Sequence, residues 1–323
     1  MTLRIGTRGS ELALFQADAV AAQLRGKTGL ACETVVIRTS GDTLADASLA
    51  QIGGKRLFVK EIEDALLDGE IDLAVHSSKD MPVILPEGLR IAGVLPREDA
   101  RDAVILPAER GQGMSVDELV SRLGSAPRIG TSSVRRTAQL ARWFPGARFL
   151  PIRGNLGTRL RKLDTGEYDA LVLASAGLIR LRQHARISAS LPIAACVPAP
   201  GQGIIAVEIR EKDDHVAAAV AAIEDAHARA ALDAERAVVV KLGGGCQMPI
   251  GAHAAVIDTG ALRLTAIVLS LDGKRTIRAE SRGAERDAAR LGTAVAEDLL
   301  SRGAAEILAE VQQAHAAVEG IQP

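Results

Sequence analysis

The chain has 323 residues, of which 47% are hydrophobic and 24% are charged, a composition typical of a globular protein with two or three domains. Its 39 Lys and Arg residues nearly balance 40 Asp and Glu residues, and the formal net charge of −1 excludes a protein that attracts nucleic acid or an anionic membrane through its overall charge. Aromatic residues make up 2%, so a base-stacking surface is not expected either.

The N-terminal residues and the cysteines predict a cytoplasmic protein. The first 20 residues lack the basic-then-apolar layout of a signal peptide, and no apolar run approaches the roughly 18 residues of a membrane helix. Cys32, Cys196 and Cys246 are an odd number without a C-x-x-C pair, and the six histidines show no metal-ligand spacing. We expect neither a disulfide framework nor a metal site.

The first 70 residues read as alternating strands and helices. Strands are predicted at 3–6 and 34–38, helices at 11–24 and 56–68, and a mobile loop at 41–55. Ser10 stands where the first helix begins, and its glycine-containing turn offers free backbone N–H groups to an anion. This turn is a weak signal alone, because most strand-to-helix turns contain small polar residues.

An apolar strand at 71–75 then stops at a group of ionisable residues. Pro82 prevents orderly continuation, so His76, Lys79 and Asp80 are expected to project at the carboxyl end of the strand. Ligands bind at that end of the strands in open α/β sheets. The alternative is a loop in which Lys79 and Asp80 pair in solvent.

The second hundred residues repeat the first. Residues 128–133 and the following helix match the first strand and helix, and 166–173 match 69–75, again after an amphipathic helix. The offsets of the two matches differ, so the pattern indicates two lobes of one topology rather than a tandem repeat, with chance similarity as the alternative.

Two crossings should connect the lobes, and a third domain follows them. The crossings are predicted at 95–102 and 198–203, and if the strand at 204–209 returns to the first lobe, the ligand cleft lies between hinged lobes. Later residues predict helices over 213–242, a meander at 252–257, 262–271 and 274–282, and helices over 285–313. The predicted domains are 1–97 with 201–217, 101–197, and 218–323.

Arginines gather at the predicted helix starts of the second lobe. Arg135 and Arg136 fall in a first helical turn, where the helix dipole disfavours cations unless an anion is present. With other cations they would line the cleft with carboxylate-binding groups, namely Arg8, Lys55, Arg153, Arg159 and Arg180. The alternative is a set of solvated helix-end cations. On the cleft interpretation, Arg135→Leu should weaken binding and barely change stability.

Cys246 stands in a glycine-tight turn after residues 243–245 and before Pro249. A buried inert cysteine is the commoner case. This turn instead favours a thiol held out into a cleft, as a nucleophile or a covalent tether.

Together these residues resemble the porphobilinogen deaminase family along almost the whole chain. The matching strings occur in the family's order, and several ordered strings are more specific than any one of them. They are RGSELAL (8–14), GGKRLFVKE (53–61), HSSKD (76–80), GTSSVRR (130–136), RGN (153–155), PGQG (200–203) and GCQMP (245–249).

The resemblance implies an α/β fold with two lobes similar to type II periplasmic binding proteins and a smaller α+β C-terminal domain. It implies a dipyrromethane cofactor joined to Cys246 by a thioether, and four porphobilinogens added head to tail with loss of ammonia before water releases the linear tetrapyrrole. Asp80 matches the catalytic aspartate. Cofactor-binding positions are Cys246, Lys79, Asp80, Ser133, Arg135 and Arg136. Substrate-binding positions are Arg8, Ser10, Lys55, Phe58, Arg153, Arg159 and Arg180.

The family implies a monomer. Ser78 and Arg56 depart from the family's usual residues, which puts loop flexibility rather than chemistry in doubt, and 108–113 should be a surface excursion. The alternative from another class is a non-enzymatic two-lobed anion-binding protein. It would explain the arginines but neither Asp80 beside Lys79 nor Cys246.

Overall fold

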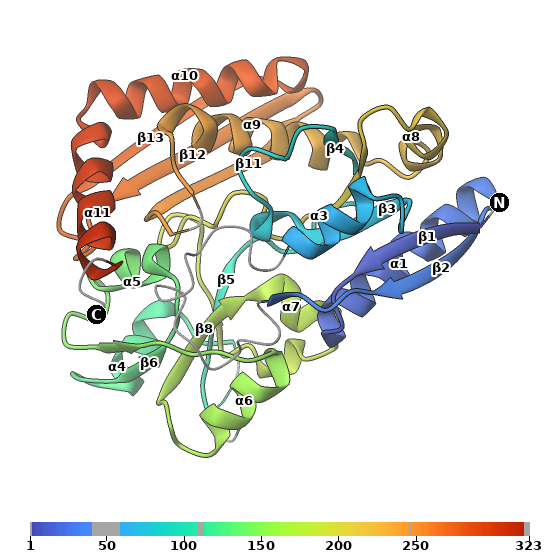
Figure 1. The fold of residues 1–323 in the computed structure, drawn as a ribbon. Helices are drawn as coiled ribbons and strands as arrows, with labels where there is room; N and C mark the ends of the chain where they lie inside the picture. Colours follow the sequence, from blue (N-terminus) through green and yellow to red (C-terminus); the bar gives the residue numbers. More distant parts are fainter. Residues whose placement is uncertain (1, 41–58, 109–110, 112, 246, 320–323) are drawn as a thin grey trace.

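A computed structural model describes residues 2–40, 59–108, 111, 113–245 and 247–319. Figure 1 shows three bodies: an N-terminal lobe mostly in blue with β4 in teal and α8 in gold, a second lobe mostly in green, and a C-terminal domain in orange and red. In the described part of the chain no helix is long and apolar enough to cross a membrane.

Lobe 1 is a mixed sheet with strand order β2-β1-β3-β10-β4, in which β10 runs antiparallel to both of its neighbours. Its strands are β1 (Thr2–Thr7), β2 (Ala31–Val36), β3 (Leu73–Ser77), β4 (Leu89–Val94) and β10 (Ile205–Arg210). Helices cover both faces, since α1 and α8 share one core with β1 and β3 while α3 packs on the other side. These helices are α1 (Glu11–Thr28), α3 (Lys60–Leu67) and α8 (Asp214–Ala221).

Lobe 2 repeats this arrangement with strand order β7-β6-β8-β5-β9, in which β5 is antiparallel to its neighbours. Its strands are β5 (Asp102–Ile105), β6 (Arg128–Gly130), β7 (Arg148–Leu150), β8 (Ala170–Ala174) and β9 (Ala189–Ser190). Its helical segments are α4 (Val116–Leu123), α5 (Val134–Leu140), α6 (Leu156–Asp164), α7 (Ser175–Arg180) and η3 (His184–Arg186). The prediction of two lobes with one topology is confirmed.

The same arginine–aspartate contact recurs in both lobes. Arg4 of β1 donates to both carboxylate oxygens of Asp72, before β3, and Arg128 of β6 does the same to Asp169, before β8. The Nη2–Oδ1 distances are 2.7 and 2.8 Å. Each guanidinium also donates to a glycine carbonyl three residues before its aspartate. The repeated sequence pattern therefore builds one local structure twice.

Two hydrogen-bonded crossings connect the lobes. Leu95 N–H donates to Ile205 O at 3.1 Å, and Glu98 N–H donates to Gly203 O at 3.0 Å. Gly203 has a φ of 89°, and a Cβ there would lie 2.4 Å from the carbonyl oxygen of Glu98, so this approach requires glycine. β5 and β10 are the first strands after the two crossings, and the predicted return to lobe 1 is confirmed.

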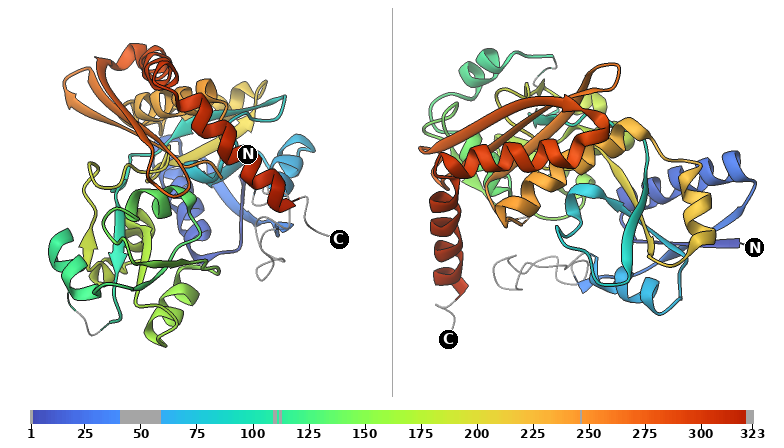
Figure 2. Two further views of the ribbon diagram at one scale, coloured as in Figure 1. Left: turned by 90° about the vertical axis from the view of Figure 1, so that its left-hand side faces the viewer. Right: turned by 90° about the horizontal axis from the view of Figure 1, so that it is seen from above.

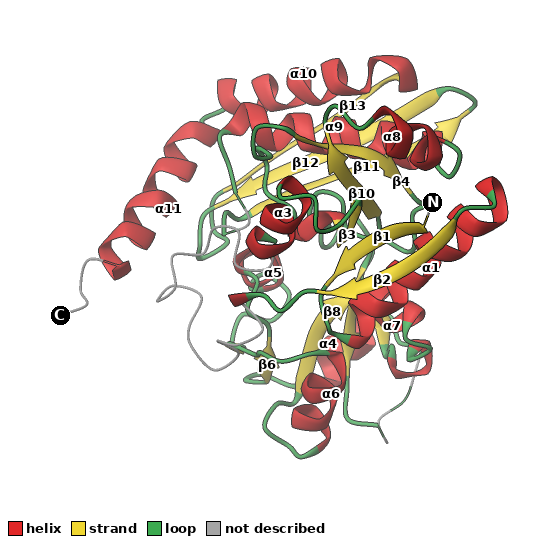
Figure 3. Ribbon diagram, turned by 45° about the vertical axis from the view of Figure 1, so that its right-hand side comes forward, coloured by secondary structure: helices red, strands yellow, loops and turns green. Residues whose placement is uncertain are grey.

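The C-terminal domain is the antiparallel sheet β11-β12-β13 with helices packed on one face. Its elements are α9 (Ala226–Leu242), β11 (Ile250–Asp258), β12 (Ala261–Leu269), β13 (Thr276–Ala284), η4 (Glu285–Asp287), α10 (Ala288–Ser301) and α11 (Ala304–Glu319). Figure 3 shows α9 and α10 along this sheet, and Figure 2 shows α11 projecting away from α10. The predicted meander is confirmed.

A buried ion pair joins this domain to the crossings. Arg97 Nη1 lies 2.6 Å from Oε1 of Glu235 on α9, whose side chain is fully buried. The Glu235 carboxylate also accepts from the N–H groups of Gly201 and Ala254, at 2.6 and 2.7 Å. One carboxylate thus binds lobe 1, the second crossing and the C-terminal sheet.

Some element boundaries differ from prediction. The helical run over 213–242 is two helices, because Asp225 caps a new helix by accepting from Ala228 N–H at 2.7 Å. β2 begins at Ala31, three residues before the predicted strand, where it pairs with Thr2 of β1. The predicted mobile loop lies outside the described residues, as do 109–110 and 112 of the predicted surface excursion.

Candidate active site

Asp80 lies on a short helical turn, η2 (Ser78–Asp80), directly after β3. The residues on either side of Lys79 and Asp80 are fixed in the interior: Ser78 is buried and donates its N–H to Ile204 O at 2.9 Å, and Met81 is 3% exposed. Asp80 itself is exposed. The protein therefore holds both ends of this turn and leaves the carboxylate accessible.

A small cleft beside Asp80 brings in the predicted anion-binding turn. It is lined by Arg8 and Ser10 as well as by Asp80. Ser10 is the N-cap of α1 and accepts from Ala13 N–H. Gln16, which sequence reasoning did not select, also lines the cleft and donates to Ser77 Oγ at 2.8 Å. The turn and the carboxylate thus share one cleft.

Cations from both lobes surround Asp80. Burial lowers the pKa of Lys79 to about 8, an effect that Asp80 opposes and Arg136 strengthens. Burial also lowers the pKa of Arg159, with repulsion from Arg136 and Arg153 and an opposing attraction from Asp80. Cations disfavoured by burial and by one another are stabilised by an anionic ligand. This set of donors fits a ligand with several carboxylates.

Arg135 and Arg136 already have an anion, the carboxylate of Asp102 at the start of β5. Arg135 Nη1 lies 2.7 Å from Oδ2, and Arg136 donates to Oδ1 through Nε and Nη2 at 2.9 and 2.8 Å. Gln202 of the second crossing donates to the same Oδ1 at 2.9 Å. Burial alone would raise the pKa of Asp102, but the two arginines outweigh it and hold that pKa far below its usual range.

This burial corrects the expectation that Arg135 is a surface residue. Arg135 is 4% exposed and Arg136 is 8% exposed, and Arg135 also donates to Val197 O at 2.6 Å. Ser133 is the N-cap of their helix and accepts from Arg136 N–H. The anion that these first-turn arginines require therefore comes, at least in part, from the protein itself.

Arg135→Leu should consequently destabilise the fold by about 3 kcal/mol, because it removes one partner of a buried carboxylate. Arg122→Leu is the matched control, since Arg122 is an exposed arginine in the last turn of α4 in the same lobe. Denaturant unfolding of both variants measures the difference. Equal stability of the two variants would contradict a structural role for Arg135.

Three further predicted arginines lie in the described structure. Arg153 precedes α6 and is partly exposed, and Arg159 in its first turns donates to Gly154 O at 2.8 Å. Arg180 at the end of α7 donates to Gly203 O at 2.6 Å, and burial lowers its pKa to about 10. Arg180 therefore contacts the crossing, whereas Arg159 is close enough to Asp80 to interact with its charge.

His76 lines the same cleft as Asp80, as predicted, but its side chain is buried in the sheet rather than projecting from it. It is 5% exposed, and its Nε2 lies 3.0 Å from Oε2 of the fully buried Glu208 on β10. The strand continues through His76 to Ser77, so the end of the strand comes later than the sequence suggested and the imidazole stays in the sheet. Its contact with Glu208 is part of the β3–β10 interface.

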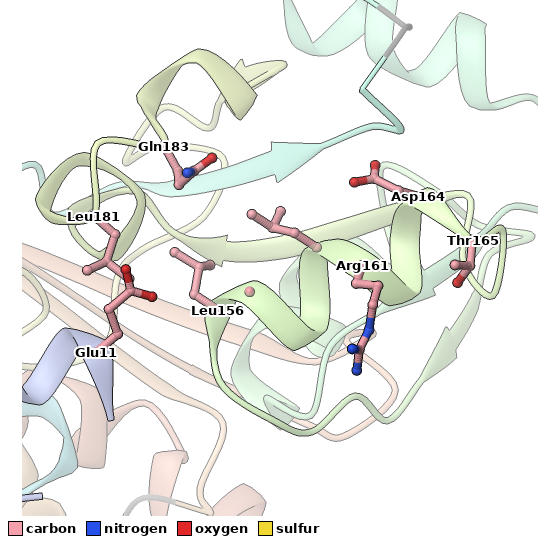
Figure 4. A pocket seen from close by; sticks show the side chains of 9 residues that line it. Glu11, Leu156, Arg161, Asp164, Thr165, Leu181 and Gln183 are labelled. Carbon is pink, nitrogen blue, oxygen red and sulfur yellow. The ribbon is translucent and has the colours of Figure 1, made fainter. Parts of the chain in front are cut away.

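A larger cavity of about 430 Å³ lies between α6 and the segment after α7, and Figure 4 shows its lining. It includes none of the predicted site residues. Its lining carries charges of both signs, because Arg161 lines it together with Glu11 and Asp164. Such a lining does not favour a polyanion, so size alone does not identify the site.

Other predicted site residues cannot be placed. Lys55, Phe58 and Cys246 lie outside the described residues.

Comparisons with known proteins find one family. The profile of the porphobilinogen deaminase dipyromethane cofactor binding domain matches residues 3–218, and that of the porphobilinogen deaminase C-terminal domain matches 230–301. A porphobilinogen deaminase from Syntrophobacter fumaroxidans is 44% identical over 313 residues, which cover 97% of this chain and 98% of the relative.

The chain also has a weak likeness to solved structures. The Bordetella pertussis BvgS VFT2 domain is 15% identical, with a TM-score of 0.41 over 69% of this chain and 86% of its own. An ancestral cationic amino acid solute binding protein is 17% identical, with a TM-score of 0.41 over 68% of this chain and 86% of its own.

The two lobes of one topology and the cations around an exposed carboxylate define an α/β protein whose cleft is chemically suited to a carboxylate-rich ligand. The two family profiles and the 44% identical relative identify one family within this class. The chain belongs to the porphobilinogen deaminase family, whose N-terminal part binds a dipyrromethane cofactor. A non-enzymatic anion-binding protein is therefore not favoured.

Sequence reasoning missed the role of Asp102. A signal was present, because Asp102 precedes an apolar run as Asp72 does. Asp72 pairs with arginines on strands of its own sheet, Arg4 at 2.7 Å and Arg210 at 3.8 Å, whereas Asp102 pairs with two arginines from a helix start. No residue near Asp102 in the sequence indicates that its partners are Arg135 and Arg136.

Proposed function

We propose that this protein condenses four porphobilinogen molecules head to tail, a transferase reaction that makes a linear tetrapyrrole. Each step breaks the bond between the substrate's aminomethyl carbon and its nitrogen, and ammonia leaves with a proton. The carbon forms a bond to the free α-carbon of the preceding pyrrole, which then loses its proton. Water ends the sequence by releasing the four-ring product.

We further propose Asp80 as the catalytic residue. Loss of ammonia leaves a cationic pyrrole, and a carboxylate near its ring N–H stabilises that charge. The observation that carries this assignment is the contrast between two neighbouring carboxylates. Asp102 is fully buried and saturated by two arginines, whereas Asp80 is exposed beside cations of both lobes.

The surrounding cations hold the carboxylates of the rings. Arg8 and the Ser10 turn, which line the cleft beside Asp80, would bind some of these carboxylates, and Lys79, Arg153 and Arg159 would bind others. The dipyrromethane cofactor supplies the first acceptor ring when bound. We propose that Cys246 carries it and that Lys79, Ser133, Arg135 and Arg136 help to hold it, the arginines through groups not taken by Asp102.

We propose the three-domain division predicted from the sequence, with one boundary moved. Val216, Val220 and Ile223 belong to the core of lobe 1, which supports an end of that lobe near residue 224 rather than at 217. The monomeric state stays a prediction. A cytoplasmic location is proposed because an attachment thiol must remain reduced.

Intact mass spectrometry of the purified chain tests the proposed attachment. The protein should be heavier than its sequence by two pyrrole units, and a peptide digest should place the addition on Cys246. A chain of bare sequence mass that turns over porphobilinogen at a normal rate would refute the covalent cofactor.

A further inference from the structure

The C-terminal domain contacts the chain immediately after Asp80. Arg236 on α9 donates through Nη2 to two consecutive backbone carbonyls, those of Pro82 at 3.0 Å and Val83 at 2.7 Å. Residues 81–88 form neither helix nor strand, and Pro82 has no N–H to donate. A side chain from another domain therefore satisfies carbonyls that no secondary structure satisfies.

Apolar contacts strengthen the same attachment. Met81 packs in one core with Ala228 and Leu232 of α9, and Val83 packs against the core of the C-terminal domain. One helix thus holds the segment after Asp80 through its residues 228, 232 and 236. These residues are four apart and share one face of α9.

The other end of η2, the turn that carries Asp80, is held by the second crossing. Ser78 N–H donates to Ile204 O, and Gly201 approaches Ser78 so closely that a Cβ would lie 2.5 Å from its Oγ. Gly201 has a φ of 74° and itself donates to Glu235, the neighbour of Arg236 on α9. Both ends of η2 are therefore connected to neighbouring residues of α9, one through Glu235 and the other through Arg236.

We propose that Arg236 is a positioning residue, which fixes the backbone after Asp80 so that the exposed carboxylate keeps one place relative to the cations of lobe 2. This inference rests on the proposed role of Asp80. The catalytic carboxylate belongs to lobe 1 in sequence, yet the C-terminal domain sets its position. A misplacement of about 1 Å is enough to cost up to a hundredfold in rate.

The test compares Arg236→Gln, which loses the charge and the fork of donors, with Arg236→Lys, which keeps a cationic donor. Arg229→Gln is the matched control. Arg229 lies two turns earlier on α9, pairs with Glu224, and donates to a carbonyl of lobe 1, that of Ile91 at 3.4 Å. Intact mass first selects variants that carry the full cofactor, so that kcat and KM for porphobilinogen report the positioning alone.

We expect Arg236→Gln to lower kcat about tenfold or more with KM nearly unchanged, Arg236→Lys to recover part of kcat, and Arg229→Gln to retain it. Amide hydrogen exchange, measured without substrate, should quicken in the peptide covering 78–85 for Arg236→Gln and stay unchanged for Arg229→Gln.

Unchanged kcat in Arg236→Gln, or an equal loss in Arg229→Gln, would reduce Arg236 to an ordinary interface residue. Unchanged exchange in 78–85 would also overturn the proposal. If the exchange quickens but Asp80→Asn keeps full turnover, the proposed function of Asp80 fails while the attachment by Arg236 stands, so the two failures are distinguishable.

Discussion

Asp80→Asn should lower turnover at least about a hundredfold while the fold stays intact. The amide has nearly the shape of the carboxylate but lacks its charge, and stabilisation of a developing cation is worth roughly 3 kcal/mol in comparable sites. Because Asp80 is exposed, the substitution removes no buried ion pair. Steady-state kinetics with porphobilinogen and the midpoint of thermal unfolding measure the two effects separately.

Asp80→Glu provides the finer comparison, because it keeps the charge and moves it by about one methylene. It should retain partial activity and accumulate enzyme-bound chains of intermediate length, which rapid mixing followed by mass spectrometry resolves. Asp68→Asn is the control, since Asp68 is an exposed carboxylate of lobe 1 at the end of α3. Near-normal elongation by Asp80→Asn would end the assignment.

Cys246→Ser should abolish stable cofactor attachment and, with it, turnover. A serine hydroxyl is a far poorer nucleophile than a thiolate at neutral pH, so the thioether should not form. The purified variant should have its bare sequence mass. Cys32→Ser serves as the control because Cys32 lies on β2, at the edge of the lobe 1 sheet, and this variant should keep the added mass.

The outcome for Cys246 separates two roles of the thiol. If Cys246→Ser purifies with the normal added mass and normal activity, Cys246 is only structural. If the variant lacks the added mass and also unfolds at a much lower denaturant concentration than the parent chain, Cys246 is needed for the stability of the fold as well as for attachment. A denaturant unfolding curve of the purified variant measures this stability.

The sequence predicted the parts of the fold that depend on local pattern. The repeated glycine-to-aspartate segments before β3 and β8 indicated two lobes, because each repeat carries its strand, its preceding helix and its aspartate within a few residues. Ser10 was recognised as an N-cap for the same reason. Helix α4 was overlooked although Ser115 and Glu118 form a capping box, a signal that lies within four residues.

The parts that failed depend on partners far away in the chain. Arg135 was expected to contribute little to stability because its own helix offers it no anion, and its partner Asp102 is 33 residues away. His76 was expected to project at the end of the strand because its partner Glu208 comes 132 residues later in the chain. The contact of Arg236 was not predicted, because its acceptors are backbone carbonyls, which every residue has. Such contacts follow from topology, which a single sequence does not determine.

The exchange of strands between the lobes has a consequence for the order of synthesis. β10 is inserted between β3 and β4, so the sheet of lobe 1 stays divided, with two unpaired edges, until the ribosome has made all of lobe 2. The strands of lobe 2 are contiguous in the chain and can pair as soon as β9 emerges. The N-terminal lobe is thus the first to be translated and the later of the two to be completed, and its open edges must be kept from other nascent chains in the meantime.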